Sequence, residues 1–195
     1  MVALDKGQRV SLTKDHPGLK HMQICLGWDA NMYDGDDFDL DASVFLLTTT
    51  GKIDSENDFI FYNNKQHSTG AVIHTGDNRT GSGDGDDEVI NVDFTKIPEY
   101  CTQLAVVVTI DEAEKRSQNF GMVDNAYIRL VDSDTKEEVL RYDLSDSEDT
   151  NLSTALEFAR LYKKDDEWKF KAVGQGFAGG FLTMCNKFGI DVKKE

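Results

Sequence analysis

The sequence contains little cysteine and little proline, and it has no long apolar run. The three cysteines are widely spaced and form no C-x-x-C pair, which argues against a disulfide framework and against a structural zinc site. No stretch approaches about eighteen apolar residues, and the first residues show neither the pattern nor the cleavage signature of a secretory signal. We therefore expect a soluble cytoplasmic protein that does not insert directly into membranes.

Basic side chains are also scarce. The chain has 21 Lys and Arg residues against 36 Asp and Glu residues, which gives a formal net charge of −15. Such a surface repels phosphate backbones, so nucleic acid is not an expected partner. Hydrophobic residues nevertheless make up 39% of the chain and aromatic residues 10%, which is enough for a folded core and excludes disorder as a description of the whole chain.

Short runs of β-branched and aromatic residues recur along the chain and predict strands. Turn-forming clusters separate these runs, which favours an all-β fold, mainly an antiparallel β-sandwich with a few short helices. The predicted strands cover residues 9–12, 21–28, 38–47, 58–63, 71–75, 88–94, 103–110, 125–132, 137–144 and 168–173. The predicted helices cover residues 95–100, 112–117 and 179–188. Residues 153–162 are interpreted as a further strand that pairs with residues 168–173, with a helix as the alternative.

The chain shows no linker. Pro17 and Pro98 are the only prolines, no segment is of low complexity, and the predicted strands recur evenly from one end to the other. We predict a single domain over residues 1–191 and a disordered tail over residues 192–195.

Acidic side chains are concentrated in two short segments, residues 34–41 and residues 77–88. Together these segments hold ten carboxylates and one base, Arg79, and so carry −9 of the net charge. Two carboxylates about 4 Å apart repel each other by roughly 4 kcal/mol at an effective dielectric constant of about 20, so a folded site needs a compensating cation. The carboxylates are those of Asp34, Asp36, Asp37, Asp39, Asp41, Asp77, Asp84, Asp86, Asp87 and Glu88.

The first acidic segment leads into a predicted strand. Side chains two residues apart on a strand share a face, so Asp37, Asp39 and Asp41 are expected to point one way while Phe38 and Leu40 point into the core. The second segment is a loop whose glycines allow the tight turns that aim carbonyl and carboxylate oxygens at one point.

Oxygen donors of this kind suit Ca²⁺, which takes about six to eight oxygens from carboxylates, amides and backbone carbonyls. Mg²⁺ prefers octahedral geometry and retains water, and transition metals favour His or Cys, which neither segment contains. The EF-hand pattern does not fit, because Arg79 and Phe38 stand where it needs Asp or Asn. A single acidic, glycine-rich loop is most simply a solvated turn, but two dense segments favour a calcium site of another kind.

Other motifs are weaker. The spacing Gly174-x-Gly176-x-x-Gly179 matches a dinucleotide-binding loop, but only sixteen residues follow it, which is too few for the rest of that fold. A strand-to-helix turn is the better interpretation. Glu112 begins a predicted helix, where the helix dipole explains an acid, and direct contact with a metal is the alternative. The four histidines are scattered and are interpreted as structural.

Several segments together give the chain a family resemblance. They read LGWD (26–29), DFDLDAS (37–43), DFIFYNN (58–64), HTGDNRTGSGDGDDE (74–88), NFG (119–121), NAYIR (125–129) and AVGQGFAGG (172–180). On these segments, which span nearly the whole chain, the sequence resembles the TerD family of tellurium-resistance and general stress proteins. The resemblance implies a cytoplasmic, calcium-binding β-sandwich that works with other tellurite-resistance and stress proteins, including a membrane-embedded partner.

The same resemblance implies which residues bind the metal. Two calcium ions are favoured, without a division of the ligands between them. The implied ligands are Asp37, Asp39, Asp41, Asp77, Asn78, Asp84, Asp86, Asp87 and Glu88.

Three functions follow from these expectations. The favoured one is a calcium-loaded interaction module rather than an enzyme. A calcium-dependent peripheral membrane module is an alternative, and it requires exposed basic or apolar residues near the ion. A metal-dependent hydrolase is a further alternative, disfavoured because no nucleophile, general base or substrate pocket can be recognised.

Overall fold

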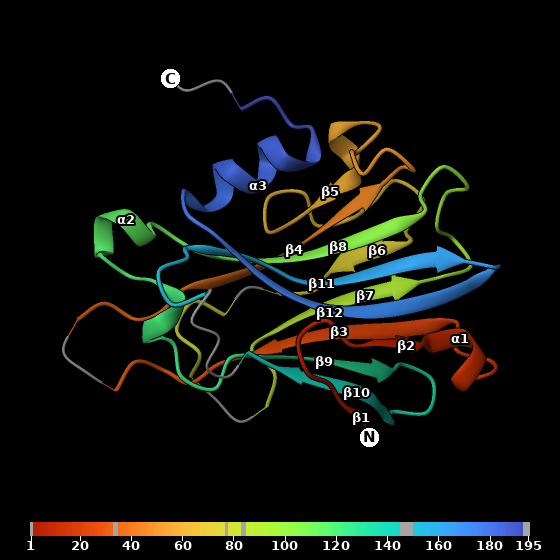
Figure 1. Ribbon diagram of the computed structural model, residues 1–195, viewed down its shortest axis with the longest axis horizontal. Coiled ribbons are helices and arrows are strands. Elements are labelled where there is room, and N and C mark those ends of the chain that lie inside the picture. The colour runs from red at the N-terminus through yellow and green to blue at the C-terminus, as the bar shows by residue number, and fades with distance from the viewer. Residues whose placement is uncertain (1, 33–34, 77, 83–84, 145–149, 193–195) are drawn as a thin grey trace.

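Two β-sheets packed face to face form the body of the protein (Figure 1). The computed structural model describes residues 2–32, 35–76, 78–82, 85–144 and 150–192. Within these residues nearly every strand pairing is antiparallel, and three short α-helices accompany the sheets. The predicted all-β, mainly antiparallel sandwich with a few short helices is therefore confirmed.

The first sheet has the strand order β1-β10-β9-β3-β7-β6. β1 pairs with β10 in parallel, and the other pairs are antiparallel. The register places Ile24 of β3 opposite Ile90 of β7 and Leu130 of β9, so three buried side chains pack together on the inner face. The strands are β1 (Val2–Ala3), β3 (His21–Gly27), β6 (Val72–His74), β7 (Glu88–Asp93), β9 (Tyr127–Asp132) and β10 (Glu138–Asp143).

The second sheet has the order β2-β12-β11-β8-β4-β5, and its pairings are antiparallel. A tight turn joins β11 to β12 at Asp165 and Asp166, whose φ angles of 55° and 59° are those of a two-residue hairpin turn. The prediction that residues 153–162 form a strand paired with residues 168–173 is confirmed. The strands are β2 (Arg9–Ser11), β4 (Leu40–Leu47), β5 (Phe59–Ile60), β8 (Gln103–Ile110), β11 (Ala155–Lys164) and β12 (Glu167–Phe177).

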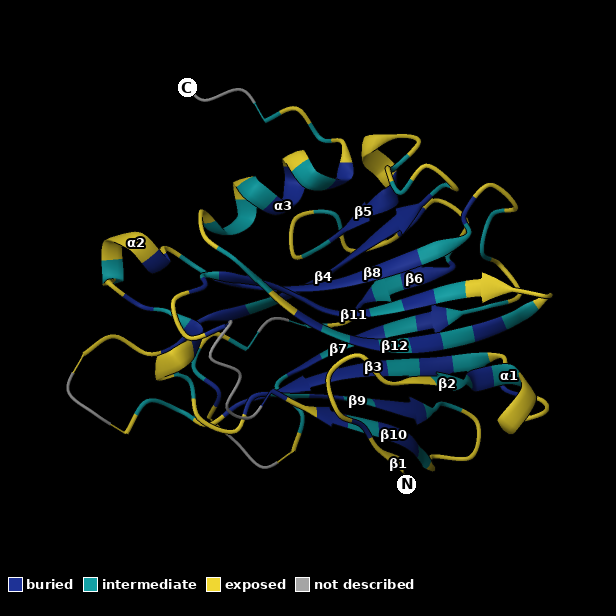
Figure 2. Cartoon of the chain, viewed as in Figure 1, coloured by how far each residue is buried: buried dark blue, intermediate teal, exposed yellow. Residues whose placement is uncertain are grey.

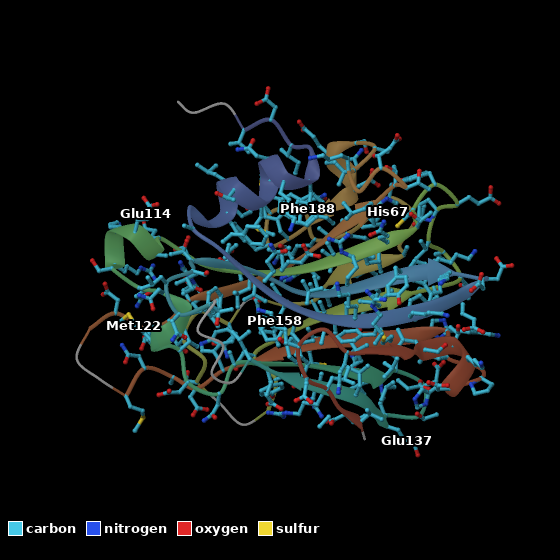
Figure 3. All side chains as sticks on the ribbon, viewed as in Figure 1. His67, Glu114, Met122, Glu137, Phe158 and Phe188 are labelled. Atoms are coloured by element: carbon cyan, nitrogen blue, oxygen red, sulfur yellow. The ribbon has the colours of Figure 1, made fainter. Side chains whose placement is uncertain are left out.

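The inner faces of the two sheets bury one large apolar core, seen as the dark strands of Figure 2. Alternate residues of β4, namely Leu40, Ala42 and Val44, point into it, as the period of a strand dictates. Phe158 of β11 lies in the middle of the molecule (Figure 3), and its ring meets that of Tyr142 on β10 edge to face at 5.4 Å. This contact joins the two sheets.

A second apolar cluster lies on the outer face of the second sheet, under α3 (Gly180–Phe188). Phe45 of β4 stacks on Phe59 of β5 with ring centroids 4.1 Å apart, and Phe188 of α3 lies 4.6 Å from Phe45. β4 is therefore buried on both faces, which explains its nearly continuous apolar sequence. α3 ends at Gly189, whose φ of 100° is that of a glycine C-cap.

Two of the three predicted helices are confirmed, and the helix predicted at residues 95–100 is wrong. That segment forms separate turns, in which the N–H of Lys96 donates to the carbonyl of Asp93 and the N–H of Cys101 to that of Pro98. Pro98 has no N–H to offer a longer helix. The remaining helices are α1 (Leu12–Asp15), α2 (Ala113–Arg116) and the 3₁₀ turns η1 (Glu56–Asp58) and η2 (Phe120–Met122).

The C-terminal segment follows α3. Ile190 and Val192 pack against the second apolar cluster. Of the tail predicted at residues 192–195, residues 193–195 lie outside the described residues, and the domain boundary at residue 191 stays a prediction. In the part of the chain that the structure describes, no helix has the length and apolar character needed to cross a bilayer.

Candidate functional site

The loops that carry the acidic segments meet at one end of the sandwich, on the left of Figure 1. Residues 28–39 connect β3 to β4, residues 75–87 connect β6 to β7, and residues 111–126 connect β8 to β9. The register explains the meeting, because Leu26 at the end of β3 lies opposite Glu88 at the start of β7. The convergence of the two acidic segments is thus a consequence of strand pairing.

Trp28 joins the first two of these loops. Its backbone N–H donates to Oδ2 of Asp87 at 3.0 Å, and its indole Nε1–H donates to the carbonyl of Phe38 at 3.1 Å. The buried ring packs on Gly81, where an added Cβ would lie 2.7 Å from Cδ1 of the indole. The two acidic segments are therefore held together through one aromatic side chain.

Asp87 and Asn78 are paired within the second loop. Asn78 Nδ2 donates to Oδ1 of Asp87 at 2.7 Å. Burial raises the pKa of the Asp87 carboxyl; the hydrogen bond from Trp28 opposes this, and the charges of Asp86 and Asp29 raise the pKa further. Burial is the larger cause of the raised pKa, and the neighbouring charges of Asp86 and Asp29 are the part that a cation would relieve.

Asp37 and Asp39 line a hollow of about 580 Å³. Asp39 is buried, and its Oδ2 lies 3.4 Å from Nε of Arg79, whose side chain is 69% exposed. Because the Arg79 side of this pair is exposed to solvent, a cation that binds Asp39 can take the place of the guanidinium while Arg79 is hydrated by water. The remaining lining residues are Asp36, Glu112, Lys115 and Arg116.

The prediction that Phe38 and Leu40 point into the core is confirmed, but the strand predicted to carry Asp37 and Asp39 on one face with Asp41 is wrong. β4 begins only after Asp39, because the backbone before it bonds to side chains, as when the carbonyl of Phe38 accepts from the indole of Trp28. Asp41 alone of the three lies on the strand, at the edge of a separate hollow of about 460 Å³. The acidic hollow is thus built by loops.

Gln118 is a buried side chain at this site that the sequence analysis did not single out. Its Nε2 donates to the carbonyls of Asp36 at 2.9 Å and Asp37 at 3.2 Å. Gln118 is 5% exposed, and no donor in the described residues reaches its Oε1. A buried carbonyl oxygen requires a donor or a cation. The available signal was its position directly before the NFG segment at residues 119–121.

Asp86 is held on the outer face of the first sheet. Its Oδ1 and Oδ2 accept from Nε and Nη2 of Arg129 on β9, each at 2.8 Å, and Tyr127 Oη donates to Oδ1 at 3.0 Å. Burial alone would raise the pKa of Asp86, but hydrogen bonds from Arg129 and Cys25 lower it below its ordinary value. The compensating cation for this carboxylate is therefore a side chain of the protein.

Glu88 is buried between the sheets. Its Oε2 accepts from the N–H of Ala42 on β4 at 2.5 Å and lies 3.9 Å from Nε2 of His74 on β6. Because Ala42 belongs to the second sheet and Glu88 to the first, this carboxylate ties the sheets together beside the loops. Its position is that of a structural anchor.

The predicted ligands therefore separate into groups. Asp77 and Asp84 lie outside the described residues. Across the ranges that are described, no three acidic, histidine or cysteine side chains are arranged to hold a metal ion. Of the predicted ligands, Asp87 bonds to Trp28 and Asn78 bonds to Asp87, while Asp37 and Asp39 flank Phe38, whose carbonyl accepts from the Trp28 indole. Those held in other contacts are Asp41, Asp86 and Glu88.

A second hollow of about 570 Å³ lies next to Trp28. Asp29 lines it, and Oδ2 of Asp29 accepts from Nδ2 of Asn125 at 2.6 Å. The carbonyl of Gly85, also in the lining, accepts from Tyr127 Oη at 3.3 Å. Asp29 belongs to the LGWD segment, and the sequence analysis did not assign it as a ligand.

Comparison with known sequences places relatives along the whole chain. A family model described as the TerD domain matches residues 1–188. Tellurium resistance protein TerD from Serratia marcescens is 52% identical over 190 residues, which cover 97% of this chain and 98% of that one. General stress protein 16U from Bacillus subtilis (strain 168) is 49% identical over 192 residues, which cover 98% of each chain.

Comparison with solved structures supports the fold. A homologue of telluride resistance protein (TerD) from Streptomyces coelicolor A3(2) matches with a TM-score of 0.68, over 86% of this chain and 95% of that one. A protein of unknown function, SAV2460, matches with a TM-score of 0.71 over the same shares. Both are 19% identical to this chain, so the likeness shows the sandwich fold alone.

Proposed function

This chain belongs to the TerD family of tellurium-resistance and stress proteins, and on that premise we propose that it is a cytoplasmic calcium-binding module that presents a surface to other proteins of the tellurite and stress response. The names of the relatives above describe resistance and stress roles. The proposal is accordingly a binding module rather than an enzyme, with a membrane-embedded protein among its partners.

One observation carries the calcium proposal. The acidic hollow is lined by the carboxylates of Asp37 and Asp39. Gln118, whose Nε2 donates to the backbone carbonyls of Asp36 and Asp37, brings a buried amide oxygen, Oε1, that none of the described donors reaches. These are the oxygen donors that Ca²⁺ takes, and the hollow has no histidine or thiol among its described lining residues. The residues present therefore fit calcium better than a transition metal.

The first ion would be held by Asp37, Asp39 and Gln118, and a second by Asp29 and Asp87 beside Trp28. A bound calcium ion supplies positive charge that oxygen ligands from different loops can share. Trp28 keeps the two loops at a fixed separation through its hydrogen bonds to Asp87 and Phe38.

Exposed apolar side chains lie at the same end of the sandwich. Met32, in the loop between β3 and β4, is 87% exposed, and Leu152, between β10 and β11, is 84% exposed. Met122 is labelled at this end in Figure 3, and its loop lies beside that of Leu152 because the N–H of Gly121 donates to the carbonyl of Asn151 at 3.2 Å. We take these tips to be the surface that a protein partner contacts.

The same exposed side chains favour one second function, calcium-dependent docking to a membrane surface. Membrane docking requires exposed basic or apolar residues at the end of the molecule that holds the ion, and Met32, Met122 and Leu152 are exposed apolar residues of that kind. An acidic loop end repels anionic lipid unless calcium neutralises it. This function therefore depends on calcium entirely.

Isothermal titration of the full chain with Ca²⁺ and with Mg²⁺ tests the proposal. We expect saturable Ca²⁺ binding, with two ions per chain and preference over Mg²⁺. Asp39→Asn combined with Asp87→Asn should abolish most of the heat. Calcium at about 100 times its dissociation constant should stabilise the fold by about 2.7 kcal/mol, measured as a rise in melting temperature.

The matched control is Asp165→Asn with Asp166→Asn, which removes the same charge from the β11–β12 turn, where Asn tolerates the positive φ. Calcium binding that is equally weak for both metals, or equally reduced by both double variants, would contradict a specific site. Sedimentation with phosphatidylserine vesicles in calcium, lost with Met32→Ser and Leu152→Ser, would favour the membrane function over the protein surface.

A further inference from the structure

The basic residues of this acidic chain are concentrated on the outer face of the second sheet. A groove of about 540 Å³ crosses β2, β12, β11 and β8 there, beside α3. Its described lining contains six of the chain's 21 basic residues and one carboxylate, that of Glu157. The six basic residues are Arg9, Arg160, Lys163, Lys164, Lys171 and Lys187. We call this surface the basic groove.

Three of these cations stand directly opposite one another on neighbouring strands. Lys171 of β12 is paired in register with Arg9 of β2 on one side and with Arg160 of β11 on the other. Residues paired in this way share a face of the sheet, about 5 Å apart, and like charges so placed destabilise it. Nowhere in the described structure do Arg9 and Lys171 form an ion pair. Two of the three cations in this row, Arg9 and Lys171, therefore lack a counter-charge in the described structure.

Glu157 fixes the position of the cations at the other side of the groove. Its Oε1 accepts from Nε of Arg160 at 2.8 Å, and its Oε2 accepts from Nζ of Lys187 at 2.7 Å. Nη1 of Arg160 donates to Oε1 of Gln103 at 2.6 Å, and Nζ of Lys187 lies 4.1 Å from the centre of the Phe177 ring. Glu157 is buried, so a carboxylate below the surface orients two cations on it.

Few other acids offset the groove. Lys163 lies 3.7 Å from the fully exposed carboxylate of Asp166, a weak surface contact. Six cations against one buried carboxylate leave a strongly positive concavity on a chain whose net charge is −15. The residues outside the groove therefore carry a net charge that is more negative than −15. The positive charge is thus confined to this groove and is not a property of the surface as a whole.

We propose that the basic groove binds a small soluble molecule that carries several phosphate groups. Lys and Arg side chains are the usual ligands of phosphate oxygens, and the row of three cations can reach neighbouring phosphates of one molecule. The volume lies within the range of small-molecule sites, about 300–1,000 Å³. No exposed large apolar residue of the described chain lines the groove, and the acidic remainder repels both bilayers and nucleic acids.

The groove is separate from the acidic loop end. Its residues come from β2, β8, β11, β12 and the last turn of α3, whereas the acidic hollow is formed by loops 28–39 and 111–126 together with Arg79. Binding of a polyphosphate therefore does not depend on the calcium proposal, and either can fail without the other.

Titration calorimetry of the full, calcium-free chain with inorganic triphosphate at constant ionic strength tests the inference. We expect saturable binding of one triphosphate, tighter than binding of inorganic phosphate. Arg9→Gln with Lys171→Gln should weaken the affinity by at least about tenfold, because the loss of even one charged hydrogen-bond partner is worth about that much. Without ligand this variant should melt no lower than the unmodified chain, since the repulsion between paired cations is relieved.

Lys20→Gln with Lys65→Gln is the matched control, because it removes the same charge from exposed positions outside the groove. This control should keep the affinity within about twofold. Lys164→Gln, at the exposed hairpin end, gives a second variant should the first fail to fold, and a partial loss is expected. Absence of saturable heat overturns the inference. So does equal weakening in the control, or binding confined to phosphoinositide vesicles or to an oligonucleotide.

Discussion

Gly81→Ala is the substitution that most directly tests how the acidic loops are held together. Gly81 has a φ of 63°, a left-handed conformation, and an added Cβ would lie 2.7 Å and 3.0 Å from two atoms of the Trp28 indole. Trp28 is buried, and both its backbone N–H and its indole Nε1–H donate hydrogen bonds, so the ring has little freedom to move aside. The methyl group must therefore displace Trp28 or the loop itself.

The expected cost has two parts. A non-glycine residue in the left-handed region costs roughly 1–2 kcal/mol. Overpacking a buried ring by one methyl group costs typically about 1–3 kcal/mol. We therefore expect Gly81→Ala to lower the free energy of unfolding by about 2–5 kcal/mol. Moving Trp28 also separates Asp87 from Phe38, so calcium binding should weaken.

Urea unfolding followed by far-UV circular dichroism measures the stability, and calorimetry measures the calcium affinity. Gly76→Ala is the control in the same loop, because Gly76 has no positive φ and an added Cβ there meets nothing within 4 Å. It should change the stability by less than about 1 kcal/mol. If Gly81→Ala is as stable as Gly76→Ala, the packing of Trp28 against this glycine does not hold the loops.

Three further outcomes are expected. Arg129→Met leaves the partly buried Asp86 without its bidentate partner and should lower the free energy of unfolding, measured in urea, by about 2–3 kcal/mol. Adding Asp86→Asn to this variant, in a double-mutant cycle, should recover most of that loss. Phe158→Ala should cost about 3–5 kcal/mol because the ring fills the centre of the core, whereas Leu182→Ala, at an exposed position, should stay within about 0.5 kcal/mol by the same assay. Burial raises the pKa of the Cys25 thiol to about 12, and the other two cysteines are also buried. At pH 8 a thiol reagent should therefore not react with the native chain but should label three thiols in guanidinium; rapid labelling of the native chain would contradict this burial.

Most strands of the fold could be predicted from the local pattern of apolar residues in the sequence. Short runs rich in β-branched and aromatic residues predicted strands such as β4, and residues 153–162 were interpreted as a strand paired with residues 168–173, which β11 and β12 form. These features depend on residues close in sequence. The failed helix at residues 95–100 shows the limit, because a segment of one or two turns is decided by which carbonyl each N–H reaches, and Pro98 and Asp93 decide that here.

The site followed from the sequence only in part. Pattern predicted that acidic loops would meet, but not the partner of each carboxylate. Arg129 lies 43 residues from Asp86, and Ala42 lies 46 residues from Glu88, so the packing of the sheets alone brings these pairs together. Gln118 was missed because a neutral amide carries no charge signal. The basic groove was missed because its cations are scattered from Arg9 to the end of α3 and meet only through strand register.

Counter-charges decide which acidic oxygens need an ion. The repulsion that makes a dense acidic segment costly is already relieved for Asp86 by Arg129, and Glu88 is used in joining the sheets. The number of acids in the two segments therefore overstates their capacity for metal. The hollow at Asp39 differs in that the side chain of Arg79, which contacts this carboxylate, is 69% exposed. The basic groove shows the converse arrangement, in which one buried carboxylate, Glu157, holds two of the six cations, Arg160 and Lys187. We therefore expect a small cation and a polyanion to bind at different faces of the same molecule, and the net charge of the chain predicts neither proposed site.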